Sequence, residues 1–549
     1  MTGKENLVTL AKRPLWVVAG ILVAFVLASC GGGQKVTGSR EVQPVPVGDW
    51  KQPYETTINI TAVKDEGIDA IYEGGDSSIS NPWTRAWKDE LNIEVTYDWV
   101  TQGQYGEKLN MAIAAGNLPD VFYCSYTQFR QLLEADLIQD ITEVYQKYTS
   151  QRIRDYEKTD PDTIKTVMRD GKIYAMPAYY YGIIDNPNFL WVRKDWYETA
   201  GSPAVRTVAD FENLANVFMS EHGGYGLAVS NALGELFTTG PMFNAYLSEF
   251  WYKDSTGRIK IGIAHPETKT ALEYWAKWYK DGIINPDFAN TDWNKMVEDI
   301  INGKTGLQPA WQAQGWQIAP NLVAVNNNDN SYMIPLPLPT LDGSQVKGQV
   351  GFPNGQLIVI SKNCANPAAV MKLISHIDYI LFDPDTVLTD EQFRGFTDGQ
   401  REHVGSPFKV VDPLSDLIQY EHVSYALKTG DTSDLFTAGM RKKYEDSLAW
   451  INDRNPAGLG AYLQQGFDGS AYAHNKFLID NDFIVRTDMW GPAPEDFDRV
   501  VNPIDGVLQG FTRIIMGQEP LDSYDRIIAE WYDNGGRIME DAVNRDYNK

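Results

Sequence analysis

The pattern of apolar and polar residues predicts alternating strands and helices from about residue 57 onward. Strands are indicated where apolar residues alternate, and helices where they recur four positions apart. The first expected elements are strands at 57–63, 93–99 and 118–123 and helices at 82–92 and 105–115. A chain that alternates strand and helix in this way favours an α/β fold, in which helices cover both faces of a parallel sheet.

A second set of elements begins after a turn near Asp170 and Gly171. It comprises a strand at 188–193 and helices at 207–221 and 268–281. The apolar face of the last helix, with Leu272, Trp275 and Tyr279, is expected in the core and not in a binding site. The folded body, at roughly 500 residues, is too long for one core, so at least two lobes are expected.

Candidate ligand-binding residues stand where strands or hinge turns are predicted to end. Ligands of α/β sheets bind beyond the carboxyl ends of the strands, which favours Tyr126, Tyr180 and Tyr181. The segment from Trp311 to Trp316 combines two indoles with the amides of two glutamines. Flat aromatic faces suit the C–H surfaces of sugars, and amides suit their hydroxyl groups. Binding by this loop and simple packing of its aromatics both remain open.

Two further polar residues are weaker candidates. Arg193 could reach a hydroxyl or carboxylate of a ligand, or it could hold Asp195 two residues later or a lobe surface. Asn354 could lie in a cleft, or it could serve only the turn that the pair Asn354-Gly355 favours.

The N-terminal residues predict export from the cytoplasm. Residues 1–29 contain two adjacent basic residues and then an apolar stretch at 15–27, which is too short for a comfortable membrane span. Cys30 follows Leu-Ala-Ser, and this arrangement resembles a bacterial lipoprotein signal peptide in which Cys30 is lipidated and becomes the new N-terminus. Ordinary secretion with a lone cysteine is the alternative. Residues 30–54 are expected to form a flexible tether.

Composition excludes some partners. The chain is 43% hydrophobic and 12% aromatic, which is typical of a globular protein. Its formal net charge of −25 becomes about −27 when residues 1–29 are removed. A surface this acidic repels nucleic acid, and no basic patch interleaved with aromatics is present, so no nucleic-acid partner is expected.

Motifs for metal, nucleotide or hydrolytic chemistry are not evident. Cys124 and Cys364 could form a disulfide or remain two buried thiols, and neither belongs to a CxxC pair, so zinc is not expected. Gly303-Lys304-Thr305 lacks the preceding glycine of a phosphate loop, because Glu298 occupies that position. No HExxH or GxSxG occurs. No cofactor, metal or catalytic residue is therefore expected.

Several segments together resemble one protein family. They are Ala115–Asp120 (AGNLPD), Asp170–Pro177 (DGKIYAMP), Val192–Trp196 (VRKDW), Asn302–Gly306 (NGKTG), Ile334–Pro337 (IPLP) and Ser361–Pro367 (SKNCANP). In this order and spacing they resemble the extracellular solute-binding lipoproteins of ABC importers, carbohydrate-binding family 1. Within it they resemble the long branch related to alginate-oligosaccharide binders. The resemblance covers roughly residues 55–549.

The resemblance implies a two-lobed periplasmic-binding-protein-like fold with a multi-segment hinge. It implies an N-lobe of 55–178 and 340–385 and a C-lobe of 186–333 and 390–549, with crossings near 178–188, 334–340 and 380–390. The implied function is that of a monomer, lipid-anchored on the extracytoplasmic face of the cell membrane, which delivers a carbohydrate to ABC permease subunits. A receptor for a peptide or another solute remains an alternative, and so does a surface glycoside hydrolase with paired carboxylates.

One segment departs from the branch that the chain resembles. Long members often carry an acidic calcium loop after the first helix of the C-lobe. Residues 220–226 stand there in this chain and contain a single carboxylate, that of Glu221, whereas a calcium site needs several oxygen ligands. No calcium is expected at this position.

Overall fold

The computed structural model describes residues 49–66, 72, 75–178, 188–247, 250–352, 356–384, 386, 406–408, 410–501 and 504–548. Four of the expected functional residues, Cys30, Tyr180, Tyr181 and Asn354, lie outside these ranges. So do the expected signal peptide and most of the tether. None of the helices in the described ranges combines the length and apolar character of a membrane span.

The first sheet, as far as the structure describes it, has five strands in the order β2-β1-β3-β13-β6. Both β2 and β3 pair with β1 in parallel, as the alternation of strands and helices predicts. The late strand β13 joins the sheet antiparallel, between β3 and β6. The strands are β1 (Ile58–Asp65), β2 (Ile93–Thr101), β3 (Val121–Cys124), β6 (Met176–Pro177) and β13 (Leu357–Ile360).

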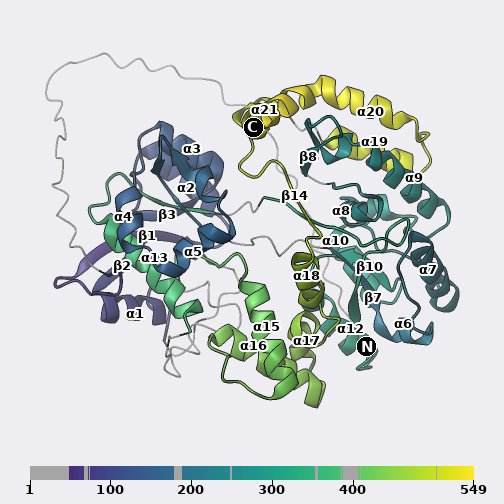
Figure 1. Ribbon diagram of the computed structural model, residues 1–549, viewed down its shortest axis with the longest axis horizontal. Helices are drawn as coiled ribbons and strands as arrows, with labels where there is room; N and C mark the ends of the chain where they lie inside the picture. Colours follow the sequence, from purple (N-terminus) through teal and green to yellow (C-terminus); the bar gives the residue numbers. More distant parts are fainter. Residues whose placement is uncertain are drawn as a thin grey trace, which may run out of the picture. The chain divides into compact units, whose positions relative to one another are not determined.

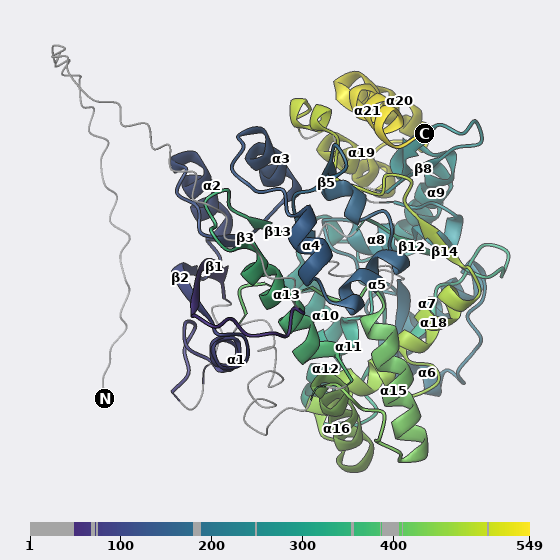
Figure 2. The same ribbon diagram turned by 60° about the vertical axis from the view of Figure 1, so that its left-hand side comes forward.

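Helices lie on both faces of the first sheet, with α2 and α3 on one side and α1 and α13 on the other (Figures 1 and 2). Their first and last residues follow local rules. Asn81 caps α1 in a capping box with Thr84, and the left-handed Gly116 ends α2 where the sequence predicts. The helices are α1 (Pro82–Leu91), α2 (Tyr105–Ala115), α3 (Tyr126–Glu134), α4 (Thr142–Tyr148), α5 (Gln151–Thr159) and α13 (Pro367–Phe382).

A second sheet, in the order β10-β7-β11, lies in the other lobe. β7 (Phe189–Arg193) is central and pairs antiparallel with both β10 (Leu307–Ala310) and β11 (Met333–Pro337). The segment at 334–337, expected to return through the hinge, is therefore a strand of this sheet. Its residues Ile334 and Leu336 pack against the second core, and alternation alone does not distinguish a sheet strand from a hinge strand.

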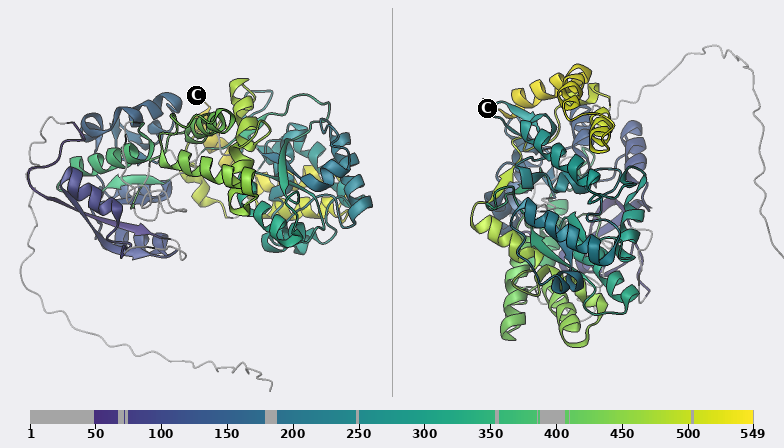
Figure 3. Two further views of the ribbon diagram at one scale, coloured as in Figure 1. Left: turned by 90° about the horizontal axis from the view of Figure 1, so that it is seen from below. Right: turned by 90° about the vertical axis from the view of Figure 1, so that its right-hand side faces the viewer.

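Helices surround the second sheet, and the C-terminal ones pack beside much earlier elements. For example, α19 contacts α9, and α21 contacts the hairpin strand β9 (Ile259–Ile261). Figures 1 and 3 show the yellow C-terminal helices beside the teal elements. The helices are α6 (Lys194–Thr199), α7 (Val208–His222), α8 (Gly234–Thr238), α9 (Pro266–Lys280), α10 (Trp293–Ile301), α11 (Gln314–Gln317), α12 (Ala319–Asn326), α15 (Ser415–Thr429), α16 (Ala438–Asp453), α17 (Leu459–Gln465), α18 (Ala471–Asp480), α19 (Asp505–Ile515), α20 (Ser523–Trp531) and α21 (Arg537–Tyr547).

Separate hydrophobic cores support the two sheets. Leu272 and Trp275 of α9 are fully buried in the second core, as their helical spacing predicts. Val346 also belongs to the second core, whereas Phe408 and Val410 belong to the first. Val346 was expected in the N-lobe, and Phe408 and Val410 were expected in the C-lobe. For Val346 the reason is the parallel pairing of β12 (Gly348–Val350) with β14 (Ile484–Arg486), which holds the chain on the side of the second sheet until about Val350.

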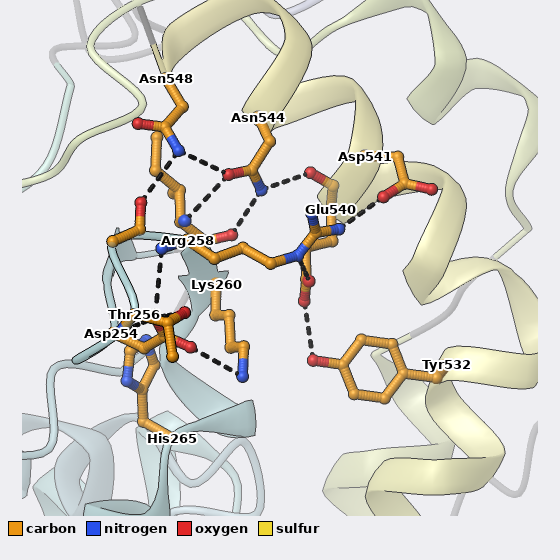
Figure 4. A network of polar contacts seen from close by, with 12 residues as sticks. Asp254, Thr256, Arg258, Lys260, His265, Tyr532, Glu540, Asp541, Asn544 and Asn548 are labelled. Atoms are coloured by element: carbon orange, nitrogen blue, oxygen red, sulfur yellow. Dashed lines mark hydrogen bonds and ion pairs between the residues drawn. The ribbon is translucent and has the colours of Figure 1, made fainter.

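The C-terminal helix is fastened to the β8–β9 hairpin (β8, Trp251–Lys253; β9, Ile259–Ile261) by a polar network (Figure 4). Arg258 pairs with Glu540 and Asp541 across this contact, and Glu540 also accepts a hydrogen bond from Tyr532. These side chains border a pocket of about 320 Å³. Because its carboxylates and Arg258 are already paired with one another, the network explains how distant segments hold together and indicates no ligand.

Candidate functional site

Tyr126 begins α3, directly beyond the carboxyl end of β3. Ser125 caps the helix, which fixes the direction in which the chain leaves the sheet. The Tyr126 hydroxyl lies 2.9 Å from Thr166 Oγ1, and its ring centre lies 5.6 Å from that of Phe352. Burial raises the pKa of Tyr126 well above its usual range. Its ring is mostly covered by protein, so any contact with a ligand would be made by a limited part of it.

Phe352 continues this aromatic row to Trp490, whose ring centre lies 5.6 Å away. Arg486 stacks on the Trp490 ring at 3.3 Å, and its Nη2 lies 3.3 Å from Asp160 Oδ1. The Trp490 indole N–H also donates to Asp160 Oδ1, at 3.1 Å. Sequence reasoning missed this cluster, because no local pattern connects Asp160 with residues more than 300 positions later.

Lys64 was also missed, although it lies near the carboxyl end of β1. Its side chain is only 2% exposed, and its Nζ lies 3.5 Å from the Tyr72 hydroxyl and 5.1 Å from the ring centre of Tyr97. The Tyr72 hydroxyl donates to Glu66 Oε2 at 2.7 Å. Burial lowers the pKa of Lys64 to about 8, and Glu66 opposes part of that shift. A lysine within a strand usually indicates a solvated face, so the sequence carried no signal for it.

Trp311 follows the last residue of β10 and is 38% exposed. Its main-chain carbonyl accepts a hydrogen bond from the indole of Trp191, at 3.0 Å, which anchors the loop to β7. Gln312 lies beneath the surface and accepts a hydrogen bond from Gln464 of α17. Trp316 belongs to α11, but its side chain lies outside the described structure. The loop therefore presents one exposed indole above buried amides.

Arg193 lies at the opposite end of β7 from the Trp311 loop, because Ala310 pairs with Phe189 and Leu307 pairs with Val192. Its guanidinium donates to both carboxylate oxygens of Asp195, at 2.8 and 3.1 Å. The side chain is 4% exposed. The structure thus favours the second interpretation of this residue: Arg193 holds Asp195 and the start of α6, and it is not brought together with Trp311.

Residues 220–226, which stand where long members of the branch carry a calcium loop, are packed directly against protein. Gly224 adopts φ +73°, and the Tyr225 N–H donates to the Lys304 carbonyl at 2.9 Å. The Tyr225 hydroxyl donates to Asp299, whose carboxylate also pairs with Lys295 and Lys304. Across the described ranges, no three His, Cys, Asp or Glu side chains are grouped as metal ligands.

The two cysteines of the folded body are free thiols. Cys124 ends β3 and Cys364 follows β13, and both are buried. Burial raises the pKa of each thiol well above its usual range. This agrees with two structural thiols and not with a disulfide.

The chain belongs to the family of bacterial extracellular solute-binding proteins, whose family model matches residues 72–381. The architecture of two α/β lobes is that of periplasmic binding proteins. Proteins of this matched class bind solutes.

Three relatives illustrate the similarity. Lipoprotein LipO of Bacillus subtilis is 20% identical over 86% of this chain and 89% of its own length. The fructooligosaccharide-binding protein FusA of Streptococcus pneumoniae is 22% identical over 50% of this chain, and the match spans 54% of FusA. The solved structure of alginate-binding protein AlgQ2 without calcium superposes with a TM-score of 0.56 at 14% identity, covering 91% of this chain and 99% of that one.

Proposed function

We propose that this protein captures an oligosaccharide between its lobes and delivers it to the permease of an ABC importer. The observation that carries the proposal is the exposed indole of Trp311, which stands at the end of β10 with a buried amide directly behind it. An aromatic face and planar amides suit a ring that has both C–H faces and hydroxyl groups. FusA and AlgQ2, named as binders of fructooligosaccharide and alginate, support the same class of ligand.

The proposed contacts with the sugar are Tyr126, Tyr180, Tyr181, Trp311, Trp316 and Asn354. Tyr126 and Trp311 contribute from elements of different lobes, and Trp316 stands on the helix that follows Trp311. Arg193 is left out because its guanidinium is engaged with Asp195.

Calorimetric titration with a panel of oligosaccharides tests the proposal. We expect at least one sugar to bind and to be recovered unchanged. Turnover of the sugar would instead favour a glycoside hydrolase. Binding of peptides but of no sugar would favour a receptor for another solute.

Trp311→Ala is expected to weaken binding of the identified sugar about 5- to 150-fold, which corresponds to the roughly 1–3 kcal/mol of an aromatic anchor. The melting temperature should change little, because the Trp311 side chain is already 38% exposed. Calorimetry and thermal melting measure the two effects. Trp293→Ala is the matched control, since Trp293 is 42% exposed at the start of α10. Equal affinities of wild type and Trp311→Ala would remove Trp311 from the site.

We also propose that Cys30 carries a lipid anchor that holds the protein on the extracytoplasmic face of the membrane. Cys30→Ala should abolish lipid labelling and release the protein from the membrane fraction, because this thiol is the proposed acceptor. Fractionation of cells grown with a labelled fatty acid measures both. Cys364→Ala serves as the control, since that thiol is buried in the folded body. A labelled Cys30→Ala protein would refute the anchor.

A further inference from the structure

The first described residues, Asp49–Tyr54, pack against the first lobe, and we call them the N-terminal clamp. They stand at the end of the stretch that the sequence predicts to be a tether. Their main chain turns, because the Gln52 N–H donates to the Asp49 carbonyl at 3.1 Å. Trp50 and Tyr54 are partly buried and pack against the first hydrophobic core. The end of the predicted tether is therefore seated on the folded body.

The clamp lies along α13. Lys372 and Tyr379 are about two turns apart on this helix, so their side chains share one face. The ring centres of Trp50 and Tyr379 lie 5.6 Å apart, and Lys51 Nζ lies 4.1 Å from the Tyr379 ring centre. At the other end of this face, Lys372 Nζ donates to the Gln52 carbonyl at 2.6 Å. The clamp thus follows the helix for about 10 Å, the rise over seven residues.

Lys372 is the clearest sign that α13 is built to receive the clamp. It is 5% exposed, and its Nζ lies 4.5 Å from the ring centre of Tyr54 and 5.6 Å from that of Tyr148. Burial lowers the pKa of Lys372, and the negative charge of Asp49 opposes this shift. A buried ammonium needs acceptors, aromatic faces or opposite charges in place of water. The clamp supplies a carbonyl, an aromatic ring and a carboxylate.

Asn92 fastens the clamp at its junction with β1. This residue caps α1 in a left-handed conformation, with φ +54°. Its Nδ2 donates to the Tyr54 carbonyl at 3.0 Å, and the Thr57 hydroxyl donates to its Oδ1 at 2.9 Å. The Tyr54 N–H donates to the Leu91 carbonyl, also at 3.0 Å. The chain is therefore held on both sides of Tyr54 before β1 begins.

The clamp is held less extensively than the strand that follows it. Lys51, Gln52 and Pro53 are exposed, whereas β1 pairs with β2 along its whole length. Segments with few buried contacts open locally at a lower free energy than the core of a protein. We therefore expect the clamp to open without unfolding of the lobe.

We propose that the N-terminal clamp is a separable joint between the lipid tether and the folded body, docked on α13 in the intact protein. The inference rests on the proposed lipid anchor at Cys30. The tether then runs from Cys30 only as far as Asp49, and its greatest reach is about 65 Å, whereas a chain free as far as Thr57 would reach about 90 Å. It leaves the body beside the last turns of α13, near Tyr379, and not beside the first residue of β1.

Trypsin measures the docking directly, because it cuts after Lys51 only when this side chain leaves the surface of Tyr379. The rate of cutting between Lys51 and Gln52 is compared in wild type, Trp50→Ala and Lys372→Met, and each protein is also melted. Methionine keeps much of the length of lysine and removes its charge. Lys362→Met is the matched control, since this lysine of the same lobe pairs with Asp136 on the surface.

Both clamp variants should be cut after Lys51 about 10- to 100-fold faster than wild type, the size of one charge-assisted hydrogen bond or one aromatic anchor. Their melting temperatures and the rate of cutting after Lys108, an exposed lysine of α2, should change little. Equal cutting after Lys51 in all four proteins would show that the clamp is not docked in solution. Faster cutting after Lys51 and Lys108 alike would show that the segment opens only with the whole lobe. Either result would overturn the inference.

Lipidated protein in vesicles of phosphatidylethanolamine and phosphatidylglycerol locates the joint. Lys35 and Arg40 provide trypsin sites before the clamp. Wild-type protein released by trypsin should retain Lys51, whereas released Trp50→Ala protein should begin at Gln52. Wild-type protein that begins at Gln52 would contradict a docked joint. If the protein does not bind the vesicles, the anchor at Cys30 fails, and the cutting rates in solution still decide whether the clamp docks.

Discussion

Gly224→Ala is expected to lower the free energy of unfolding by roughly 3–5 kcal/mol, from overpacking and from a left-handed backbone angle together. A Cβ at this position would lie 2.0 Å from the Lys304 carbonyl oxygen. That oxygen cannot move freely, because it accepts the hydrogen bond of Tyr225 N–H at 2.9 Å. The φ angle of +73° adds strain for any residue with a side chain. Urea denaturation of both proteins measures the difference.

Gly430→Ala separates the two causes. Gly430 ends α15 with φ +77°, but a Cβ there would meet nothing within 4 Å. Its replacement should cost only about 1–2 kcal/mol, the price of the backbone angle alone. Equal losses in the two variants would show that the Lys304 carbonyl moves aside, and the close approach would then have no structural role.

Asp378→Asn is expected to gain stability relative to wild type as the pH rises from 4 to 8. Asp378 of α13 is 1% exposed, and burial raises the pKa of its carboxyl group to about 7. Hydrogen bonds from Tyr156 and Ser150 and the charge of Arg152, whose Nε lies 3.8 Å away, lower this pKa but only partly offset the burial. Asp412 raises it further.

The direction of this change in relative stability follows from proton linkage. Between about pH 4 and pH 7 the folded wild type retains a proton that the unfolded chain has released. Its stability therefore falls by up to about 1.4 kcal/mol per pH unit, or about 4 kcal/mol in all. The loss is complete above pH 7. Asparagine does not ionise, so the difference between the proteins should change by about 3–4 kcal/mol over this range.

Denaturation at several pH values measures this difference. Ser375→Ala in the same helix is the control, because serine does not titrate, and its effect should be the same at every pH. A pH-independent difference between wild type and Asp378→Asn would mean that Asp378 ionises equally easily in the folded and unfolded chains.

The local sequence was sufficient to predict the parallel strands of the first sheet. Apolar alternation at 57–63 and 93–99 predicted β1 and β2, and Gly116 predicted the end of α2. These features depend on side-chain periodicity and on backbone preferences within a few residues, so they can be recognised without knowledge of the rest of the chain. The motifs that resemble solute-binding proteins likewise agree with the family that the chain matches.

Contacts between residues far apart in the sequence determined the placing of other segments, which the local sequence did not predict. The segment at 334–337 forms the edge strand β11 through its pairing with β7, which joins residues about 140 positions apart. Arg193 was a candidate for ligand binding until the fold placed Ser331 within 3.1 Å of its guanidinium, beside Asp195.

In the candidate site, too, the sequence determined some features and the tertiary structure determined others. The sequence by itself determined that Trp311 and its neighbouring glutamines lie next to one another along the chain. Only the tertiary structure placed Gln464 against Gln312 and set Trp191 beneath the loop. The physical reason is that burial and hydrogen-bond satisfaction depend on segments that meet only after the lobe has folded.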